Sequence, residues 1–332
     1  MDYINLGNTG LKVSRICLGC MTYGSPATGK LLTGRQAWAL NEADSKPFLG
    51  QALDLGINFF DTANVYSGGD SEIVVGRFLR VNTRREAVVL ATKVCIPMRE
   101  EPNGRGLSRK EIIFELEQSL KRLETDYVDL YQIHRWDYET PIEETLEALH
   151  DMVKAGKVRY IGASSMYSWQ FAKALYVSEL HEWTRFVSMQ NHYNLIYREE
   201  EREMMGLCRS EKIAVLPWSP LARGRLARPW KSETTKRVET DVFGNTMYSH
   251  TEAADEQVVN AVGRVAEQRG ISQAQVALAW LLSRPGVISP IVGATKPHHL
   301  QDAVAALGVQ LTKEENAALE APYIPHPVLG FS

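Results

Sequence analysis

Short apolar runs alternate along this chain with longer amphipathic segments, and this alternation is its clearest pattern. About eight runs of each kind follow one another, which is typical of repeated strand–helix units around a parallel sheet. The apolar runs predict strands over Arg15–Cys20, Ile57–Ala63, Val88–Val94, Val128–His134, Arg159–Ser164, Val187–Asn191, Ala214–Trp218 and Pro290–Ala294. The pattern therefore predicts an α/β fold, specifically a (β/α)8 TIM barrel.

Two of the amphipathic segments carry helix start signals. In Ser108–Leu123, Ser108 is followed three residues later by Glu111, which is a capping box, and apolar residues then recur at helical spacing. Pro141–Lys154 opens with a proline at a first-turn position and has the same spacing. We expect helices in both segments that cover the barrel.

Two segments depart from the alternation. Ile4–Val13 places Gly7-Asn8-Thr9-Gly10 between apolar residues, which predicts an N-terminal β-hairpin that plugs the N-terminal end of the barrel. Ala222–Ala254 is polar and rich in turn residues, and it predicts a long loop after strand seven, of the kind that is usually functional or mobile. Because the chain has no linker-like stretch and no sequence repeat, we expect a single domain over residues 1–332.

Composition and charge exclude several classes of protein. Of the 332 residues, 44% are hydrophobic and 23% are charged, as in soluble globular proteins. The formal net charge of −3, with Lys and Arg spread along the chain, provides no basic stripe for nucleic acid. No apolar run approaches the roughly 18 residues of a membrane span, and the N-terminus is polar rather than signal-like. We therefore expect a cytoplasmic protein without nucleic-acid or membrane partners.

The four cysteines are too few and too scattered for a disulfide scaffold, which fits a reducing compartment. Cys17 and Cys20 form a CxxC, which is the spacing of a redox pair or of half a zinc site. They stand in an apolar run, however, where strand alternation directs their sulfurs to opposite faces. We therefore expect them to be structural.

Ionisable residues follow three successive predicted strands. Strand two ends in Asp61 and is followed by Tyr66, strand three ends near Lys93, and strand four ends in His134. Burying Lys and Asp is costly unless they pair, so packing alone does not explain this set. Active sites of barrels lie at the C-terminal ends of the strands, and the chain lacks the GxGxxG of a doubly wound nucleotide-binding sheet.

These residues stand in motifs that resemble the aldo-keto reductase family. The matching motifs are Ile57-Asn58-Phe59-Phe60-Asp61-Thr62-Ala63 with Tyr66, Ser71-Glu72 and Gly76, the opening Leu6 to Ser14, Ala91-Thr92-Lys93, Gln132-Ile133-His134, Gly162-Ala163-Ser164-Ser165 and Pro217-Trp218-Ser219-Pro220-Leu221. The resemblance covers essentially the whole chain. Two further stretches, His134 to Tyr138 and Ser219 to Leu226, are similar to the bacterial YajO-type branch, near aryl-alcohol dehydrogenases and potassium-channel β subunits.

The residues themselves support carbonyl reduction. Adding hydride to a carbonyl develops negative charge on its oxygen, so a proton donor is needed there, and Tyr66 is the candidate. A free tyrosine has a pKa near ~10, so a neighbouring cation that stabilises the tyrosinate helps, and Lys93 can supply it. Asp61 is expected to hold Lys93 charged. His134 is expected to bind the carbonyl oxygen as a neutral imidazole.

The resemblance also implies which residues hold the cofactor. Ser164, Ser165 and Gln190 match positions that bind the nicotinamide amide, and Trp218 matches the aromatic residue on which the nicotinamide stacks. The other implied cofactor residues are Gly19, Cys20, Met21, Asp61, Ser219, Pro220, Leu221, Ala222, Gly224, Arg225, Gly293, Thr295, Lys296, His299 and Asp302. Lys296 stands where relatives place a cation for a 2′-phosphate, so we expect NADP(H), with NAD(H) as the alternative.

The expected substrate is a small-molecule aldehyde or ketone, aromatic or small aliphatic. Expected substrate contacts are Tyr23, Tyr66, His134, Trp136 and Trp230, with Trp218 beside them, and this aromatic group suits aryl carbonyl compounds. No HxH ends a strand, so no metal is expected. Three alternatives stay open: a cofactor-binding regulatory or redox-sensing subunit, a metal-dependent hydrolase, and a sugar-phosphate activity such as a lyase that uses Lys93 as a Schiff base. The sequence does not determine the oligomeric state.

Overall fold

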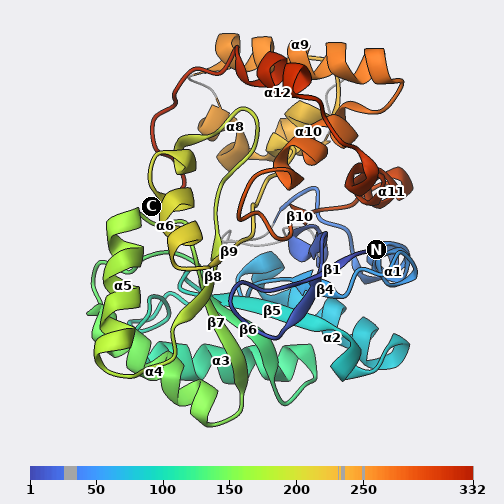
Figure 1. Cartoon of the computed structure of the whole chain (residues 1–332). Helices are drawn as coiled ribbons and strands as arrows, with labels where there is room; N and C mark the ends of the chain where they lie inside the picture. Colours follow the sequence, from blue (N-terminus) through green and yellow to red (C-terminus); the bar gives the residue numbers. More distant parts are fainter. Residues whose placement is uncertain (26–35, 231, 233–235, 249–250, 332) are drawn as a thin grey trace.

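A ring of parallel strands forms the centre of the molecule (Figure 1). The computed structural model describes residues 1–25, 36–230, 232, 236–248 and 251–331. Within these residues, eight parallel strands pair in the order β10-β3-β4-β5-β6-β7-β8-β9. They are β3 (Cys17–Gly19), β4 (Phe59–Asp61), β5 (Val89–Val94), β6 (Val128–Ile133), β7 (Val158–Ser164), β8 (Phe186–Gln190), β9 (Ala214–Val215) and β10 (Ile291–Val292).

The two ends of this sheet meet, so the barrel closes. Val215 of β9 pairs with Val287 in a parallel bridge, and the amide of Ile288 donates to the carbonyl of Val215 at 3.0 Å. The amide of Ile291 in β10 donates to the carbonyl of Pro217 at 2.9 Å. These bonds confirm the predicted (β/α)8 TIM barrel.

Each predicted strand contains or overlaps an observed one, but most observed strands are shorter. For example, β9 has two residues although Ala214–Trp218 was expected. The chain nevertheless follows β8 beyond β9, because the amides of Leu216 and Trp218 still donate to the carbonyls of Met189 and Asn191. Backbone pairing between these two chain segments therefore continues as far as Trp218.

Helices surround the strand ring, with α2 to α5 and α9 to α12 on opposite sides of it in Figure 1. Their bounds are α1 (Glu42–Asp54), α2 (Asp70–Asn82), α3 (Arg109–Leu123), α4 (Ile142–Lys154), α5 (Ser168–Leu180), α6 (Met204–Ser210), α9 (Glu252–Arg269), α10 (Gln273–Leu282), α11 (Pro297–Ala305) and α12 (Lys313–Glu320). Both helices with predicted start signals are present as α3 and α4.

The start signals themselves act differently from the prediction. Ser108 accepts a hydrogen bond from the Glu111 amide at 3.3 Å, but the Glu111 carboxylate pairs with Arg99 at 2.7 Å. Only half of the expected capping box therefore forms, because a long-range ion pair competes for the glutamate. Pro141 stands at the N-cap of α4, one residue before the first turn.

The prediction of one long loop over Ala222–Ala254 is wrong in part. The segment contains the 3-10 helix η5 (Ala222–Ala227), α7 (Lys236–Thr240) and α8 (Val242–Tyr248), and α9 begins within it at Glu252. Residues 231, 233–235 and 249–250 lie outside the described residues. Buried Asp241 organises this segment, because its carboxylate accepts from the Gly244 amide and pairs with Arg223 and Arg237.

The predicted hairpin closes the N-terminal end of the barrel. Its strands β1 (Tyr3–Asn5) and β2 (Lys12–Ser14) pair antiparallel. Leu6 and Val13 are fully buried in a cluster that also contains Cys17 and Phe59, the first residues of β3 and β4. The hairpin and its role as a plug are thus confirmed.

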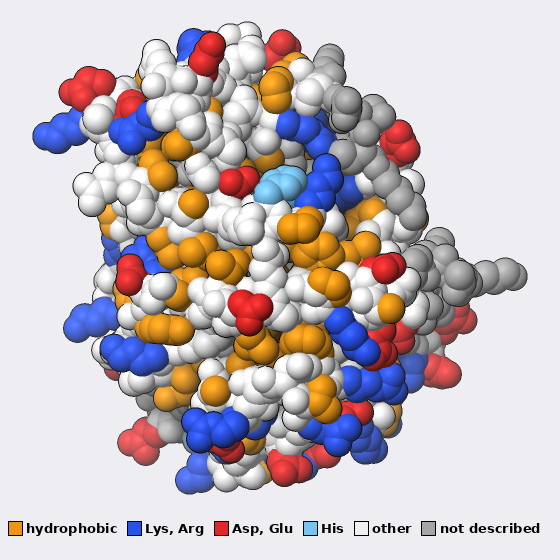
Figure 2. Space-filling model, turned by 90° about the vertical axis from the view of Figure 1, so that its right-hand side faces the viewer, with side chains coloured by type: hydrophobic (Ala, Val, Ile, Leu, Met, Phe, Trp, Pro, Cys, Tyr) orange, Lys and Arg blue, Asp and Glu red, His pale blue; other side chains and the backbone are white. Residues whose placement is uncertain are grey.

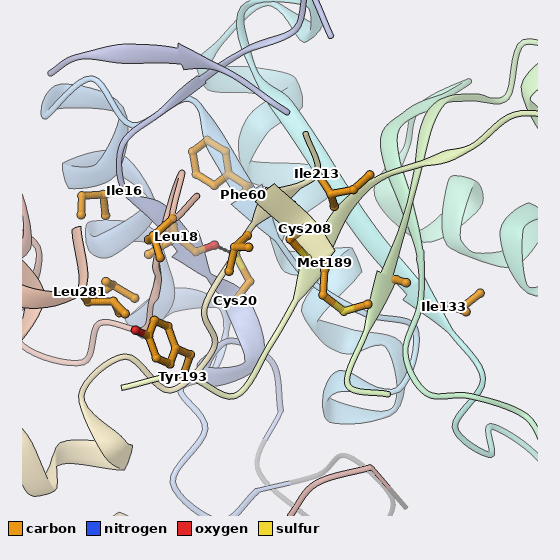
Figure 3. Close-up of a cluster of buried hydrophobic side chains, with 14 of the residues drawn as sticks. Ile16, Leu18, Cys20, Phe60, Ile133, Met189, Tyr193, Cys208, Ile213 and Leu281 are labelled. Carbon is orange, nitrogen blue, oxygen red and sulfur yellow. Dashed lines mark hydrogen bonds between the residues drawn. The ribbon is translucent and has the colours of Figure 1, made fainter. Parts of the chain in front are cut away.

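A larger apolar cluster lies between the strands and the surrounding helices (Figure 3). Cys20 belongs to this cluster, whereas Cys17 belongs to the hairpin cluster, so the two sulfurs lie on different sides of the barrel wall as expected. The reason differs slightly from the prediction, since β3 ends at Gly19 and Cys20 begins the 3-10 helix η1 (Cys20–Thr22).

Candidate active site

A buried ion pair lies at the C-terminal end of the barrel. Asp61 is the last residue of β4, and its Oδ2 lies 2.6 Å from Nζ of Lys93 near the end of β5. Both side chains are almost fully buried. The same Nζ donates to the Thr62 carbonyl at 2.8 Å and to the Tyr66 hydroxyl at 3.3 Å. Three of the predicted catalytic residues therefore meet at one ammonium group.

Burial and neighbouring charges set the protonation states of Lys93 and Tyr66. Burial lowers the pKa of Lys93, but Asp61 and Tyr66 oppose burial and bring the pKa above its ordinary value. Burial raises the pKa of Tyr66, and the nearby charge of Lys93 reduces that rise. At neutral pH, Lys93 is therefore charged and Tyr66 carries its proton, which it can donate.

His134 completes the predicted set. It follows β6, and its ring stands edge-on to the Tyr66 ring with the centroids 5.7 Å apart and the planes at 80°. Burial, Lys93 and Arg135 hold its pKa well below the ordinary value, so the imidazole is neutral. Its Nδ1 is buried without a hydrogen-bond partner among the described residues. A neutral ring can donate one hydrogen bond to a bound oxygen.

Two glutamine amides hold the second oxygen of Asp61. Nε2 of Gln132 in β6 and Nε2 of Gln190 in β8 donate to Oδ1 at 3.0 and 2.9 Å. No role was predicted for Gln132 from the sequence, although an amide side chain within an apolar strand is a usable signal. Gln190 was expected to bind the nicotinamide amide, and in this structure its amide group also orients Asp61.

The segment that carries Tyr66 is fixed by polar contacts that the sequence did not reveal. Thr62 and Ser71 share a hydrogen bond of 2.9 Å, and Nδ2 of Asn64 donates to Glu115 of α3 at 2.9 Å. The Ser71 hydroxyl also donates to the Cys20 carbonyl at 2.8 Å. Ser71 of the family motif therefore ties the Tyr66 segment to the end of β3.

Trp218 is held on three sides at the ends of β7 and β9. Its indole N–H donates to the Ser165 hydroxyl at 3.0 Å, and its backbone amide donates to Asn191 at 2.7 Å. One face of its ring lies parallel to the His192 ring. Ser164 donates to the Gln190 carbonyl at 3.0 Å. The expected nicotinamide contacts Ser164, Ser165, Gln190 and Trp218 thus lie together.

The chain after Trp218 makes a tight irregular turn. Ser219, Ala222, Arg223 and Gly224 all have positive φ, which is strained for residues other than glycine. Arg225 follows, with its guanidinium 5.1 Å from the Tyr248 ring centroid. Winding of this kind turns backbone amides toward one side and can cradle an anion. Pro220 and Leu221 lie within the same turn.

A second group of predicted residues lies between β10 and α11. Gly293, Thr295 and Lys296 precede α11, and Lys296 is its exposed N-cap. Thr295 donates to Nδ1 of His299 at 3.2 Å, and burial together with His298 and Lys296 lowers the pKa of His299 to about 4. Figure 2 shows the face that carries α1 and α11, where a histidine has Lys or Arg side chains on its right and an acidic side chain on its left.

This group adjoins the end of β3, which pairs with β10. A Cβ atom on Gly293 would lie 3.3 Å from the hydroxyl of Thr22. Thr22 directly follows Gly19, Cys20 and Met21 in the chain. Asp302 accepts a hydrogen bond from Gln275 at 2.9 Å. The structure thus brings Gly19–Met21 and the Gly293–His299 segment to one side of the barrel mouth.

The predicted substrate contacts divide into two groups. Trp136 directly follows His134 and Arg135, and its ring lies 6.2 Å from that of Trp169, a residue that the sequence analysis missed. Trp230 instead packs beside Arg225, 5.8 Å from its guanidinium.

Tyr23, which was predicted as a substrate contact, lies between the strand ring and α1. It is fully buried, its hydroxyl donates to the Ala294 carbonyl at 3.2 Å, and its ring stacks on Phe48 of α1. The apolar packing between the strand ring and α1 takes up the whole side chain.

Comparison with known proteins establishes the family. A model of the aldo/keto reductase family matches residues 15–324. The chain belongs to the aldo/keto reductase family. It is 44% identical to the versiconal hemiacetal acetate reductase of Aspergillus parasiticus, over 99% of this chain and 98% of the relative, and 40% identical to the putative aryl-alcohol dehydrogenase AAD16 of Saccharomyces cerevisiae, over 97% of each.

Structure comparison agrees. The crystal structure of a thermostable aldo-keto reductase, Tm1743, with the inhibitor epalrestat matches with a TM-score of 0.76 and 28% identity, over 97% of this chain and 100% of that one. These reductase and dehydrogenase relatives support an oxidoreductase. No helix among the described residues is long and apolar enough to cross a membrane. The same residues contain no cluster of three or more His, Cys, Asp or Glu side chains suited to a metal ion.

Proposed function

We propose that this protein reduces aldehydes or ketones to alcohols with NADPH, and that Tyr66 is the proton donor. The observation that carries the proposal is the Tyr66 hydroxyl 3.3 Å from the Lys93 ammonium, which is buried against Asp61. Neutral His134 stands edge-on to the same tyrosine. A proton donor, a cation behind it and a neutral hydrogen-bond donor are the groups that carbonyl reduction requires.

The residues present fit a nicotinamide cofactor. Trp218 is partly exposed, and the face of its ring opposite His192 is the expected stacking surface for the nicotinamide. Ser164, Ser165 and Gln190 surround it with polar groups. The turn from Ser219 to Arg225 suits the pyrophosphate, and the exposed cation of Lys296 suits a 2′-phosphate, which favours NADP(H) over NAD(H).

The chain's own residues then perform the proton chemistry. When bound, NADPH supplies the hydride that adds to the carbonyl carbon. Tyr66 donates its proton to the carbonyl oxygen, and Lys93 stabilises the resulting tyrosinate. Asp61 keeps Lys93 charged, while Gln132 and Gln190 orient Asp61. His134 donates a hydrogen bond to the same carbonyl oxygen, and a proton from solvent restores Tyr66.

We place the substrate beside Trp136 and propose an aryl carbonyl compound. The pair of Trp136 and Trp169 next to His134 provides an aromatic wall, and relatives named for versiconal hemiacetal acetate and for aryl alcohols are compatible with it. The same proposal includes three further points. They are placement in the YajO-type branch, a single domain over residues 1–332 and a cytoplasmic location.

The direct test compares the protein with its Tyr66→Phe variant. The variant should keep NADPH binding and lose turnover of 4-nitrobenzaldehyde by about 10²–10⁴-fold, since a positioned acid contributes that much. Tyr167→Phe, at an exposed tyrosine on the same side of the barrel, is the matched control and should retain full activity. NADPH oxidation that does not depend on Tyr66 would reject the mechanism.

Other outcomes of this test point to the alternatives. Tight NADPH binding without reduction of any carbonyl in a broad panel would favour a cofactor-sensing subunit. Trapping of a substrate on Lys93 by borohydride would favour a lyase.

The aromatic wall has its own test. Trp136→Ala should raise KM for an aryl aldehyde and leave NADPH affinity nearly unchanged, because it removes contact with the substrate alone. Trp183→Ala, which removes an indole between α5 and β8 at the other end of the barrel, should change neither constant. A loss of NADPH affinity in the Trp136 variant would contradict this placement.

A further inference from the structure

His192 lies directly behind Trp218, and the proposed reaction leaves it without a role. Its side chain is fully buried, and it stands two residues after Gln190, the last residue of β8. The imidazole stacks on the Trp218 indole with centroids 4.3 Å apart and planes at 13°. On its other face the Tyr197 ring lies 4.2 Å away at 16°. The three rings form one continuous stack, with Trp218 at its end.

Hydrogen bonds fix the rotation of the middle ring. Nε2 of His192 lies 2.7 Å from the Tyr248 hydroxyl and 3.3 Å from Nδ2 of Asn194. Because an amide N–H can only donate, Nε2 acts as an acceptor, and the neutral ring carries its proton on Nδ1. Asn194 also donates to the Ser219 carbonyl at 3.0 Å, in the turn after Trp218. The imidazole is therefore fixed by its faces and by one edge.

The stack also contacts the segment expected to cover the cofactor. Tyr248 ends α8, and the guanidinium of Arg225 lies 5.1 Å from its ring. Phenylalanine at position 192 would supply a flat ring but no acceptor for Tyr248. Histidine supplies both the flat ring and the acceptor. It therefore links Trp218, on which it stacks, to Tyr248, whose ring lies beside Arg225.

The ring between the two aromatics is uncharged. Burial lowers the pKa of His192 well below its ordinary value, and Arg223, His326 and Arg135 act in the same direction. A neutral imidazole under Trp218 places no positive charge behind a nicotinamide ring that becomes cationic when it is oxidised.

We propose that His192 is a positioning residue that sets the plane of Trp218 against the nicotinamide ring. The inference rests on the proposed function, because it takes Trp218 as the surface on which the nicotinamide stacks. An indole that can tilt presents the nicotinamide at variable angles, and hydride transfer requires the donor carbon at close, aligned contact with the carbonyl. The stacked rings of His192 and Tyr197 prevent this tilting of the Trp218 indole.

The test replaces the ring and its hydrogen bond separately. His192→Leu removes the stack, His192→Phe keeps a flat ring without the acceptor, and Tyr248→Phe keeps the imidazole without its hydroxyl partner. The readouts are KM for NADPH, kcat, and the charge-transfer absorbance between indole and oxidised nicotinamide, with Trp218→Leu as the zero reference for the absorbance. Phe171→Leu removes another buried stacked ring, the partner of Phe186, and is the control for general loss of packing.

His192→Leu should lose most of the charge-transfer absorbance and raise KM for NADPH roughly threefold to tenfold, the range that ring-stacking energies imply. His192→Phe should recover most of both quantities, while Tyr248→Phe and Phe171→Leu should keep the absorbance. Melting temperatures identify which variants fold. Should His192→Leu not fold, Tyr197→Leu removes the support one ring further back and should weaken the absorbance in the same direction.

Two results would overturn the inference: a folded His192→Leu variant with unchanged absorbance and KM, or a His192→Phe variant as impaired as His192→Leu. Charge-transfer absorbance that persists in Trp218→Leu would also overturn it. Each of these leaves carbonyl reduction by the unaltered protein intact. Failure of the proposed function differs, since the unaltered protein would then reduce no carbonyl with NADPH.

Discussion

At the scale of single residues, the site depends on the buried carboxylate of Asp61, both of whose oxygens have hydrogen-bond partners. One oxygen of Asp61 binds Lys93 and the other accepts from two glutamines on β6 and β8. Removing one partner of such a pair leaves an uncompensated charge in the interior. The Tyr66 hydroxyl is therefore supported by one connected group of side chains, those of Asp61, Lys93, Gln132 and Gln190.

Lys93→Met tests this group. It should lower carbonyl reduction by about 10²–10⁴-fold, the contribution expected from an acid whose supporting cation is lost. Because the charge of Lys93 reduces the rise in the Tyr66 pKa that burial causes, its removal should also shift the alkaline rise of alcohol oxidation to higher pH, measured as kcat against pH. Arg85→Met removes a cation paired with Asp129 near the start of β6 and should leave that profile in place. An unshifted profile in the Lys93 variant would contradict the role of Lys93.

At the scale of elements, the C-terminal segment after α12 forms hydrogen bonds with residues that surround the site. Tyr323 donates to Glu199 at 2.6 Å, and His326 pairs with Asp255 of α9 at 2.9 Å. Beyond them, the Leu329 amide donates to the Tyr197 hydroxyl at 3.0 Å. Tyr197 is the third ring of the stack behind Trp218, so this segment supports the site through that stack.

His326→Gln should reveal how strongly this segment is held. Burial lowers the pKa of His326, but Asp255 opposes it and the pKa lies above the ordinary value of about 6.5. The pair therefore stabilises the fold fully below about pH 6.5, and its contribution is lost as pH rises through the raised pKa. The melting temperature of the variant should fall further below that of the unaltered protein at pH 5.5 than at pH 8.5. A gap that is equal at both values, or larger at pH 8.5, would contradict this pairing.

At the scale of the whole molecule, the barrel separates stability from chemistry. The hairpin buries Leu6 and Val13 at the N-terminal end, whereas Asp61, Lys93 and His134 lie at the ends of strands on the other side. Gly7 has a φ of +58°, and a Cβ there would lie 2.7 Å from the Val187 carbonyl oxygen. Changes at the hairpin should therefore alter folding without altering the reaction.

A pair of glycine variants checks this separation. Gly7→Ala should destabilise the protein by at least about 1–3 kcal/mol, because the left-handed backbone and the close carbonyls both oppose a methyl group. Gly10→Ala, where nothing lies within 4 Å of the added atom, should stay within roughly 0.5 kcal/mol. Chemical denaturation gives both values, and kcat of the folded fraction should be unchanged in each. Equal stabilities of the two variants would contradict the close fit of the hairpin.

The sequence by itself determined the strand order, the hairpin and the set of Asp61, Tyr66, Lys93 and His134, because periodicity and motif are local properties of the chain. Only the tertiary structure decided which partners each polar group finds. Glu111 pairs with Arg99 and does not complete its capping box, and the Tyr23 hydroxyl donates to the Ala294 carbonyl. The described parts of residues 222–254 form short helices around Asp241. Gln132 and His192 acquire their partners across the barrel in the same way. Such contacts join residues far apart in the chain, and burial makes them obligatory once the barrel closes.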